Sequence, residues 1–497
     1  MSRGHVQKPE KILFAAGEAV PFAKVGGLAD VITALAKALK KQKYDIRIIM
    51  PKYRSTSNFM KKHNIVLESL YKASIMLNGE KISFLVEEVI YQELPFIFVN
   101  APEFFDRDGF YTDPQTGRDF QDNLKRYVFF DKAVLETCKV MSFIPDILHC
   151  HDWHMGLVPL YKKALPEYKN VFTHTHTVFT IHNLSYQGIF PIDQYPQLDL
   201  NWKYFNMNGL EYYRHINFLK GGIVFSEAVN TVSQTYACEI QTEALGAGLE
   251  GVIQEKSIYG AFCGIMNGVD YSEWDPKTDT YLMSEFGLNY DIKSLKNKQL
   301  IKEQFSEKYG LQLDPNIPLV GMITRLFDQK GLDIFLEGIE ILLRKNIAFA
   351  ILGTGKREYE EKLIKIACAY PQHFFVRIGF DIPLSHAIEA AADMFLMPSN
   401  FEPSGLNQLY SMRYGTVPIV RKTGGLADSV TDGRTGFIFD EYHPDALIDT
   451  VLRAVHLWRS DKKAWLNIMK TGMKEDWSWK RSAKGYINMY KSILNAD

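Results

Sequence analysis

Short apolar runs alternate along the chain with longer segments in which apolar residues recur every three or four positions. In the first half, one periodic segment at 28–39 follows the pair Gly26-Gly27, and another lies at 124–138. Apolar runs bounded by glycine, proline or polar loops predict buried strands, and the periodic segments predict helices. Because strands separated by helices are typical of parallel sheets wrapped by helices, we predict an α/β fold. The predicted strands of the first half are 11–16, 46–50, 96–99, 147–150 and 178–181.

A second series of apolar runs begins around Ile265 and fills the second half of the chain. Asn267-Gly-Val-Asp270 carries a turn signal and is followed by the polar segment 271–279, so we place the main domain boundary there. The predicted strands of the second half are 319–324, 348–352, 374–378, 394–398 and 418–420. The predicted domains are 1–264, 265–476 and a C-terminal helix within 477–497 that packs back on the first domain.

One short motif occurs in both halves. Lys24-Val-Gly-Gly-Leu-Ala-Asp30 and Lys422-Thr-Gly-Gly-Leu-Ala-Asp428 share Lys, Gly, Gly, Leu, Ala and Asp in register. The match could arise by chance, since such strings are common in composition. Our interpretation is that two similar glycine turns aim helix-start N–H groups at one shared crevice, where the helix dipole favours an anion. Two doubly wound halves that face each other would form such a crevice at their strand ends.

The charge balance decides how an anion could be held. With 57 Lys and Arg against 58 Asp and Glu, the net charge of −1 provides no overall field for nucleic acid or an anionic membrane. Any anion must therefore be held by local groups. The length of 497 residues allows two to four domains, and 46% hydrophobic with 23% charged residues is typical of a globular protein.

Cysteine usage and the amino terminus bear on location. The five cysteines are scattered and form no Cys-x-x-Cys pair, which argues against a disulfide framework or a structural zinc site. The apolar stretch 12–16 is too short for a signal peptide, and no membrane span is predicted. We expect a cytoplasmic protein, with a plastid location possible if a transit segment has been removed.

Arg325 and Lys330 follow the predicted strand that begins at Leu319. A guanidinium that grips two phosphate oxygens and an ammonium point charge suit a departing diphosphate, because charge grows on its oxygens as the bond to carbon breaks. The alternative is a solvated pair of cations. Position in a strand-end loop ahead of Gly331 favours the functional interpretation.

Two further strand ends carry candidate residues. Glu402 lies in a proline- and glycine-rich loop before a predicted helix, where its carboxylate could orient sugar hydroxyls or stabilise a cationic oxocarbenium-like centre. The alternative is an ordinary acidic residue near a helix start. Gly353-Thr-Gly355 could let the backbone approach a phosphate, or could be a simple turn. The sequence has neither a complete dinucleotide-binding glycine motif nor a P-loop.

Histidines and aromatic residues gather in the first half. Cys150-His-Asp-Trp-His154, His174-Thr-His176 and His182 could form a zinc cluster, but hydrogen-bonding histidines at strand ends are the commoner outcome, so we expect no metal. Aromatic residues between 153 and 213 are expected to lie mostly in the core, and a polymer-binding groove among them is a hypothesis.

The motifs in their order along nearly the whole chain resemble the bacterial-type glycogen synthases and starch synthases, which are retaining glucosyltransferases of the GT-B fold. Individually each string is modest, and their ordered combination is specific. The matching strings are Lys24-Val-Gly-Gly-Leu-Ala-Asp30, His151-Asp-Trp-His154, Thr180-Ile-His-Asn-Leu184, Tyr186-Gln-Gly188, Asn217-Phe-Leu-Lys220, Asn267-Gly-Val-Asp270, Arg325 to Gly331, Phe401-Glu-Pro-Ser-Gly405 and Thr423-Gly-Gly-Leu-Ala-Asp428.

The resemblance implies two Rossmann-like domains that face each other across a deep cleft, with the glucan acceptor on the N-terminal side and the nucleotide-sugar donor on the C-terminal side. It implies that Arg325 and Lys330 meet the diphosphate, and that Glu402 is the residue most sensitive to change. His182 is expected to act with them near the transferred glucose. The remaining residues that it implies in donor binding are Lys24, Gly26, Gly27, Asp30, Asp152, Asn267, Gly353, Phe380, Gly405, Leu406, Tyr410, Thr423, Gly424 and Gly425.

Three positions depart from patterns found in the wider fold family. Tyr410 stands where many retaining members carry a second Glu that holds the ribose, and glycogen and starch synthases are similar to this sequence in having Tyr there. Ser404 stands where Cys is frequent in bacterial relatives. Phe380 occupies a position often held by a Tyr that stacks on the base, so the ring face is kept and its hydroxyl is lost.

By this resemblance we expect transfer of glucose from ADP-glucose to the nonreducing-end 4-hydroxyl of an α-1,4-glucan, without a cofactor or metal. Retention could follow a same-face route or a covalent adduct. The alternatives are a UDP-glucose-using enzyme, a noncatalytic glucan or nucleotide-sugar binding protein, and a glucan phosphorylase, which needs pyridoxal phosphate and a much longer chain. The resemblance leaves the oligomeric state open.

Overall fold

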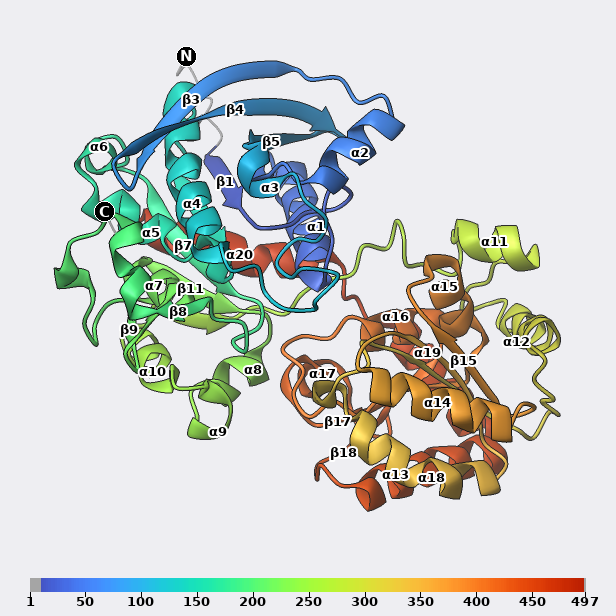
Figure 1. Cartoon of the computed structure of the whole chain (residues 1–497). Coiled ribbons are helices and arrows are strands. Elements are labelled where there is room, and N and C mark those ends of the chain that lie inside the picture. The colour runs from blue at the N-terminus through green and yellow to red at the C-terminus, as the bar shows by residue number, and fades with distance from the viewer. Residues whose placement is uncertain (1–9, 496–497) are drawn as a thin grey trace, which may run out of the picture. The chain divides into compact units, whose positions relative to one another are not determined.

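A mixed, mainly parallel sheet and a parallel sheet form the centres of two compact units in the computed structural model, which describes residues 10–495 (Figure 1). Within residues 10–495, the first unit comprises the residues up to Val232, Ala237–Ile265 and the residues from Ser482 onward. The second unit comprises Ser233–Tyr236 and Met266–Arg481. The assignment of an acceptor side and a donor side to the predicted domains 1–264 and 265–476 stays a prediction.

The second unit contains a six-stranded parallel sheet in the order β15-β14-β13-β16-β17-β18. When the strands are numbered along this unit, their order is 3-2-1-4-5-6, as in a doubly wound sheet. The order in which strands are added reverses between the first and the fourth strand. That switch point lies between β13 and β16. The strands are β13 (Leu319–Ile323), β14 (Ala348–Gly353), β15 (Phe374–Ile378), β16 (Met394–Met397), β17 (Val417–Arg421) and β18 (Phe437–Phe439).

The first unit contains a nine-stranded sheet in the order β12-β11-β7-β6-β1-β2-β5-β4-β3. The order in which strands are added reverses between β1 and β6, which pair with each other in parallel, and β1 also pairs in parallel with β2. A long antiparallel hairpin, β3 and β4, extends one edge (Figure 1). The strands are β1 (Lys11–Ala15), β2 (Asp45–Pro51), β3 (Ser69–Leu77), β4 (Glu80–Tyr91), β5 (Leu94–Asn100), β6 (Ile147–His151), β7 (His176–Ile181), β11 (Ala228–Thr231) and β12 (Phe262–Gly264), with a small separate sheet of β8 (Ile189–Pro191), β10 (His215–Asn217) and β9 (Glu211–Tyr212).

Helices cover both sheets, and α1 (Gly27–Lys41) shows why they form. Its apolar residues recur every three or four positions and are buried, and two lysines complete its last turn. Within residues 10–495, none of the helices combines the length and the apolar character needed to cross a bilayer. The remaining helices of the first unit are α2 (Arg54–Lys62), α3 (Pro102–Phe105), α4 (Asn123–Val140), α5 (Val158–Ala164), α6 (Pro166–Lys169), α7 (Phe218–Phe225), α9 (Glu243–Gly246) and α10 (Glu250–Ile258), with the 3₁₀ turns η1 (Trp153–Met155), η2 (Ile192–Leu198) and η3 (Trp202–Tyr204).

The second unit is wrapped in the same way, and two helices cross the unit boundaries in sequence. Its helices are α11 (Thr280–Phe286), α12 (Lys296–Tyr309), η4 (Asp328–Lys330), α13 (Leu332–Arg344), α14 (Arg357–Ala369), α15 (Ile382–Ala391), α16 (Asn407–Tyr414), α17 (Gly424–Ser429), α18 (Pro444–Ser460) and α19 (Lys462–Lys474). The boundary-crossing helices are α8 (Gln234–Glu239) and α20 (Trp479–Leu494).

The structure corrects two expectations from the sequence. The second series of strands does not begin around Ile265: β12 ends at Gly264 and pairs with β11 in the sheet of the first unit, and the sheet of the second unit starts at β13. The β3–β4 hairpin, which lies between the predicted strands of the first half, was not predicted. Its edge strand β3 alternates between buried and more exposed positions, a weaker signal than the continuous apolar runs of the central strands.

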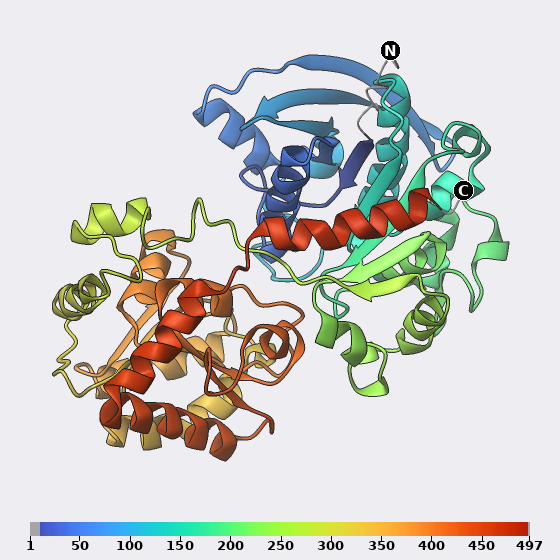
Figure 2. The same cartoon turned by 180° about the vertical axis from the view of Figure 1, so that it is seen from behind.

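The C-terminal half of α20 belongs to the first unit, and its helix is seen in red in Figure 2. Buried polar contacts fix it there. Thr180 Oγ1 donates its hydrogen bond to Asn230 Oδ1 at 2.7 Å. It therefore accepts a hydrogen bond from the N–H at His149 Nε2, 2.6 Å away. The other ring nitrogen, His149 Nδ1, therefore accepts the hydroxyl hydrogen of Tyr490 at 2.7 Å. Burial holds the pKa of His149 well below its usual range, which keeps this ring neutral.

We expect Tyr490→Phe to lower the free energy of unfolding by about 1–2 kcal/mol, because it leaves a buried ring nitrogen of His149 without a partner. Urea unfolding of the variant and of Asn488→Ala, an exposed change on the same helix, measures the difference. Equal stability of the two variants would show that the Tyr490 hydroxyl does not stabilise the native state.

Candidate functional site

In the second unit, the predicted catalytic residues flank the switch point of the sheet. Arg325 and Lys330 lie in the loop after β13, and Glu402 lies in the loop after β16. Ligands of doubly wound sheets bind outside the carboxyl ends of the strands at this point. The strand order therefore brings residues that are 72 positions apart into one place.

Lys330 and Glu402 form a buried ion pair. Lys330 Nζ donates to Glu402 Oε2 at 2.5 Å, and the side chains keep only 17% and 8% of their surface exposed. Ser399 Oγ donates to the same carboxylate oxygen at 2.9 Å. A buried charge needs a partner and hydrogen bonds, and this arrangement gives Glu402 both. The carboxylate and the ammonium group are thus held in fixed positions before any ligand arrives.

The loops that carry this pair are also joined through their backbones. Asn400 N–H donates to the carbonyl of Gln329 at 2.8 Å, and Gln329 Nε2 donates to the carbonyl of Phe401 at 3.2 Å. Gly331 adopts a φ of 73°, and a Cβ there would lie 2.1 Å from the Pro398 carbonyl oxygen. Glycine at 331 is therefore required for the close approach of the two loops.

The second glycine pair packs directly on the Glu402 loop. A Cβ at Gly424 would lie 1.9 Å from the carbonyl oxygen of Glu402, and one at Gly425 would lie 2.0 Å from that of Ser404. Gly425 N–H donates to the Glu402 carbonyl at 3.1 Å. Thr423 is the N-cap residue of α17, so the predicted turn does begin a helix. Its two glycines are explained by this packing.

Asn267 is the predicted site residue with the clearest capacity for a ligand in this unit. It is 5% exposed, and its Oδ1 has no hydrogen-bond partner among residues 10–495. A buried acceptor without a partner costs free energy, which a ligand hydroxyl would recover. Gly405, with a φ of 66°, and Leu406 lie at the start of α16, the helix that follows the Glu402 loop.

An aromatic stack fixes Tyr410 on α16. Its ring lies parallel to that of Trp274 with centroids 4.0 Å apart, and His386 stacks on the opposite face of Trp274 at 3.9 Å. Phe380, the predicted base-stacking residue, is 78% exposed. Gly353 ends β14, and a Cβ there would lie 2.0 Å from the Thr324 carbonyl oxygen, so glycine is required by strand packing.

In the first unit, the Lys24 loop occupies the position equivalent to that of the Arg325 loop. It follows β1 at the switch point, and α1 begins at Gly27 with Gly26 as its N-cap residue. Lys24 Nζ pairs with Asp30 at 2.8 Å, and both side chains stay partly exposed, at 42% and 32%. The predicted helix start after the first glycine pair is confirmed, whereas one crevice shared by the two turns stays a prediction.

Asp152 and His182 meet at the ends of β6 and β7. Asp152, with a φ of 58°, accepts the His182 backbone N–H at 2.7 Å, and burial raises the pKa of its carboxyl to about 7. Burial lowers the pKa of His182 to about 3, so this ring is neutral at pH 7. His182 Nε2 lies 3.1 Å from His151 Nδ1. Among residues 10–495, no group of three histidine, cysteine or acidic side chains is arranged to hold a metal ion.

Sequence reasoning missed several residues that hold the site in place. Ser399 hydrogen-bonds Glu402, and Trp274 stacks on Tyr410. Glu18 accepts backbone N–H groups of the Lys24 loop. Ser399 lies two residues before the Phe401–Gly405 motif and could have been found from that position, but nothing in the local pattern marks Trp274 or Glu18.

The comparisons with known proteins agree with this arrangement. Residues 11–255 match the model of the starch synthase catalytic domain, and residues 302–467 match that of the group 1 glycosyl transferases. The glycogen synthases of Koribacter versatilis and Pseudothermotoga lettingae are 41% and 42% identical, cover 97% of this chain, and are themselves covered to 97% and 99%. The chain belongs to the glycogen synthase and starch synthase family.

Solved structures place the family member among GT-B glycosyltransferases. The catalytic domain of starch synthase IV from Arabidopsis thaliana, bound to ADP and acarbose, has a TM-score of 0.87 and 31% identity, with 98% of this chain and 100% of that chain covered. Sucrose-phosphate synthase from Thermosynechococcus elongatus shares the fold at a TM-score of 0.59 and 14% identity, with 98% and 100% covered. The predicted α/β fold and the predicted glucan synthase function are confirmed, and a noncatalytic binding protein is not favoured.

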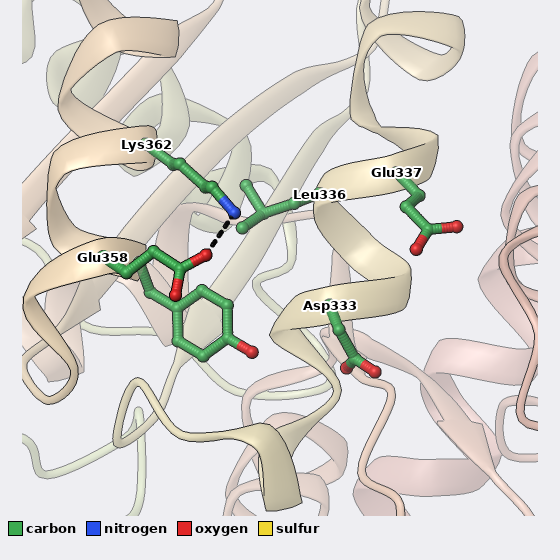
Figure 3. Close-up of a pocket in the computed structure, with 6 residues that line it drawn as sticks. Asp333, Leu336, Glu337, Glu358 and Lys362 are labelled. Atoms are coloured by element: carbon green, nitrogen blue, oxygen red, sulfur yellow. Dashed lines mark hydrogen bonds and ion pairs between the residues drawn. The ribbon is translucent and has the colours of Figure 1, made fainter.

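A hollow of about 310 Å³ in this glycosyltransferase lies between α13 and α14 and is lined by none of the predicted site residues (Figure 3). Carboxylates of Asp333, Glu337 and Glu358 line it, and the ammonium group of Lys362 pairs with Glu358 at 2.6 Å. Its excess of negative charge does not suit a nucleotide diphosphate. Glu337 is exposed and provides a matched control for changes at buried carboxylates.

We expect Asp152→Asn to change how the stability of this family member depends on pH. The pKa of Asp152 rises from an ordinary 3.8 to about 7 on folding, so the folded protein binds the extra proton and its stability falls as pH rises between those values. The variant lacks this titration and should gain about 2 kcal/mol relative to the natural protein between pH 5 and pH 8.

Urea unfolding at the two pH values measures this difference, with Glu337→Gln as the exposed control. A stability difference between Asp152→Asn and the natural protein that is the same at both pH values would contradict the raised pKa.

Proposed function

We propose that this glycosyltransferase transfers glucose from ADP-glucose to the nonreducing-end 4-hydroxyl of an α-1,4-glucan, with retention at the anomeric carbon. The observation that carries the proposal is the buried Lys330–Glu402 pair at the switch point of a doubly wound sheet. The choice of ADP is supported by the similar starch synthase domain, which is described as bound to ADP and acarbose.

Arg325 and Lys330 act on the leaving diphosphate. As the bond between the anomeric carbon and the phosphate oxygen breaks, negative charge grows on the phosphate oxygens, and fixed cations stabilise that charge more than they stabilise the substrate. Lys330 is already held in place by Glu402, so little reorganisation is needed at the moment of reaction. Lys24 contributes a further cation to donor binding, with the backbone of Gly26 and Gly27.

Glu402 acts on the sugar. Its second carboxylate oxygen, Oε1, is not the atom that Lys330 and Ser399 contact, and it is positioned to accept a sugar hydroxyl or to stabilise positive charge at the anomeric centre. Asn267 Oδ1 accepts a further hydroxyl. His182, neutral at pH 7, exchanges hydrogen bonds with the glucose without adding charge, and Asp152 fixes its backbone.

The remaining donor-site residues hold the nucleotide and the phosphates. Tyr410, fixed by Trp274, and Phe380 present ring faces to the nucleoside. The backbones at Gly405 and Leu406 and the turn at 423–425 lie around the phosphates. The proton of the acceptor hydroxyl passes either to the leaving phosphate or, in the covalent route, to a base at the second displacement, and both routes retain configuration.

Incubation of the protein with ADP-glucose and maltotriose tests the proposal through the length of the products. We expect the natural protein and Glu337→Gln to lengthen the chain, and Glu402→Ala to lower the turnover number by about 10²-fold or more. In competition, ADP-glucose should extend chains faster than UDP-glucose. Faster extension from UDP-glucose would overturn the donor assignment, and unchanged turnover in Glu402→Ala would remove Glu402 from the catalytic machinery.

A further inference from the structure

Glu18 lies buried beneath the turn that precedes α1. It is 4% exposed, and its Oε2 accepts the backbone N–H groups of Val25 at 2.5 Å and of Gly26 at 3.2 Å. Its other oxygen, Oε1, accepts the hydroxyl hydrogen of Tyr111 at 3.3 Å. One carboxyl group therefore contacts both the 24–27 turn and a loop far along the sequence.

The hydrogen bonds to Glu18 do what side-chain packing does at the second glycine pair. A Cβ at Gly26 would meet no atom within 4 Å, whereas one at Gly424 or Gly425 would overlap a carbonyl oxygen. Packing therefore fixes the second turn, and nothing comparable surrounds Gly26. Val25 itself is 48% exposed and provides no anchor. The carboxyl group of Glu18 holds the backbone of the first turn through the N–H groups of Val25 and Gly26.

Its surroundings favour a partly neutral carboxyl group. Burial raises the pKa of Glu18 to about 7, and the N–H groups of Val25 and Gly26 and the hydroxyl of Tyr111 oppose that rise. Burying a carboxyl group costs free energy, and the hydrogen bonds on both oxygens of Glu18 offset that cost in part.

Tyr111 connects Glu18 to the segment that contains Asp152. The ring of Tyr111 lies 4.2 Å from that of His154, centroid to centroid. Gly17 makes room for this contact, since a Cβ there would lie 2.9 Å from the Tyr111 hydroxyl oxygen and 3.2 Å from His154. The 24–27 turn and the 151–154 segment both lie at the switch point of the sheet. Glu18 contacts the turn directly and contacts the segment through Tyr111.

We propose that Glu18 is a positioning residue for donor binding. Glu18 fixes the 24–27 turn in the conformation that receives the nucleotide sugar, and it links that turn through Tyr111 to the 151–154 segment. The inference rests on the proposed function for its donor. It assigns to Glu18 no contact with the reacting atoms, so its effect should be on binding of ADP-glucose and on protection of the turn.

The test compares Glu18→Ala with Glu18→Gln, whose amide oxygen can still accept the two N–H groups, and with Glu337→Gln as control. In Glu18→Ala we expect about tenfold faster hydrogen exchange at the amides of Val25 and Gly26 and about a tenfold higher KM for ADP-glucose, with kcat less affected. Glu18→Gln should restore both values to within about threefold of the natural protein.

A Glu18→Ala variant with natural exchange at these two amides would overturn the proposal, and so would faster exchange with an unchanged KM for ADP-glucose. If Glu18→Ala does not fold, Glu18→Asp provides the test, because its shorter side chain cannot reach both N–H groups and should show the same changes. Hydrogen exchange needs no turnover, so a natural protein that fails to extend maltotriose would overturn the proposed function while the exchange result still decides whether Glu18 holds the turn.

Discussion

The order in which the parallel strands pair is the constraint on which both candidate regions depend. In each unit the order in which successive strands are added to the sheet reverses between two neighbouring central strands. These are β1 and β6 in the first unit and β13 and β16 in the second. The loops after these strands carry Lys24 and Asp152 in one unit and Arg325 and Glu402 in the other. These loops follow neighbouring strands, although the residues that they carry are far apart in sequence.

Buried charge is the second common feature, and the two units handle it differently. In the second unit, Glu402 is paired with a lysine and hydrogen-bonded by Ser399, so its charge is balanced within the fold. In the first unit, Glu18 and Asp152 accept mainly backbone N–H groups, and burial raises the pKa of both to about 7. The arrangement in the second unit favours a fixed carboxylate, and burial in the first unit favours the neutral form of both carboxyl groups.

Much of the fold and the candidate site could be predicted because continuous apolar strands and strand-end loops leave local signals. The run that became β13 and the cations after it were visible in the sequence, and so was the glycine pair that begins α1. The partners of these residues were not visible. Trp274 supports Tyr410 from 136 positions away and Glu18 contacts Tyr111 across 93 positions, so the contacts exist only once the sheets have formed.

The glycines show the same limit. The sequence predicted that Gly353 and the pair Gly424-Gly425 serve a phosphate, whereas the structure shows that a carbonyl oxygen lies where each side chain would be. A short motif reveals that glycine is needed and does not reveal which neighbour requires it. Their part in ligand binding stays a prediction.

We propose that Arg325 and Lys330 hold the diphosphate of the donor, and titration calorimetry with ADP and AMP tests this role. Arg325→Met and Lys330→Met should each weaken the binding of ADP by about tenfold or more, equal to about 1.4 kcal/mol. They should weaken the binding of AMP much less, because AMP lacks the second phosphate. Equal losses for ADP and AMP, or no loss for either, would contradict the account.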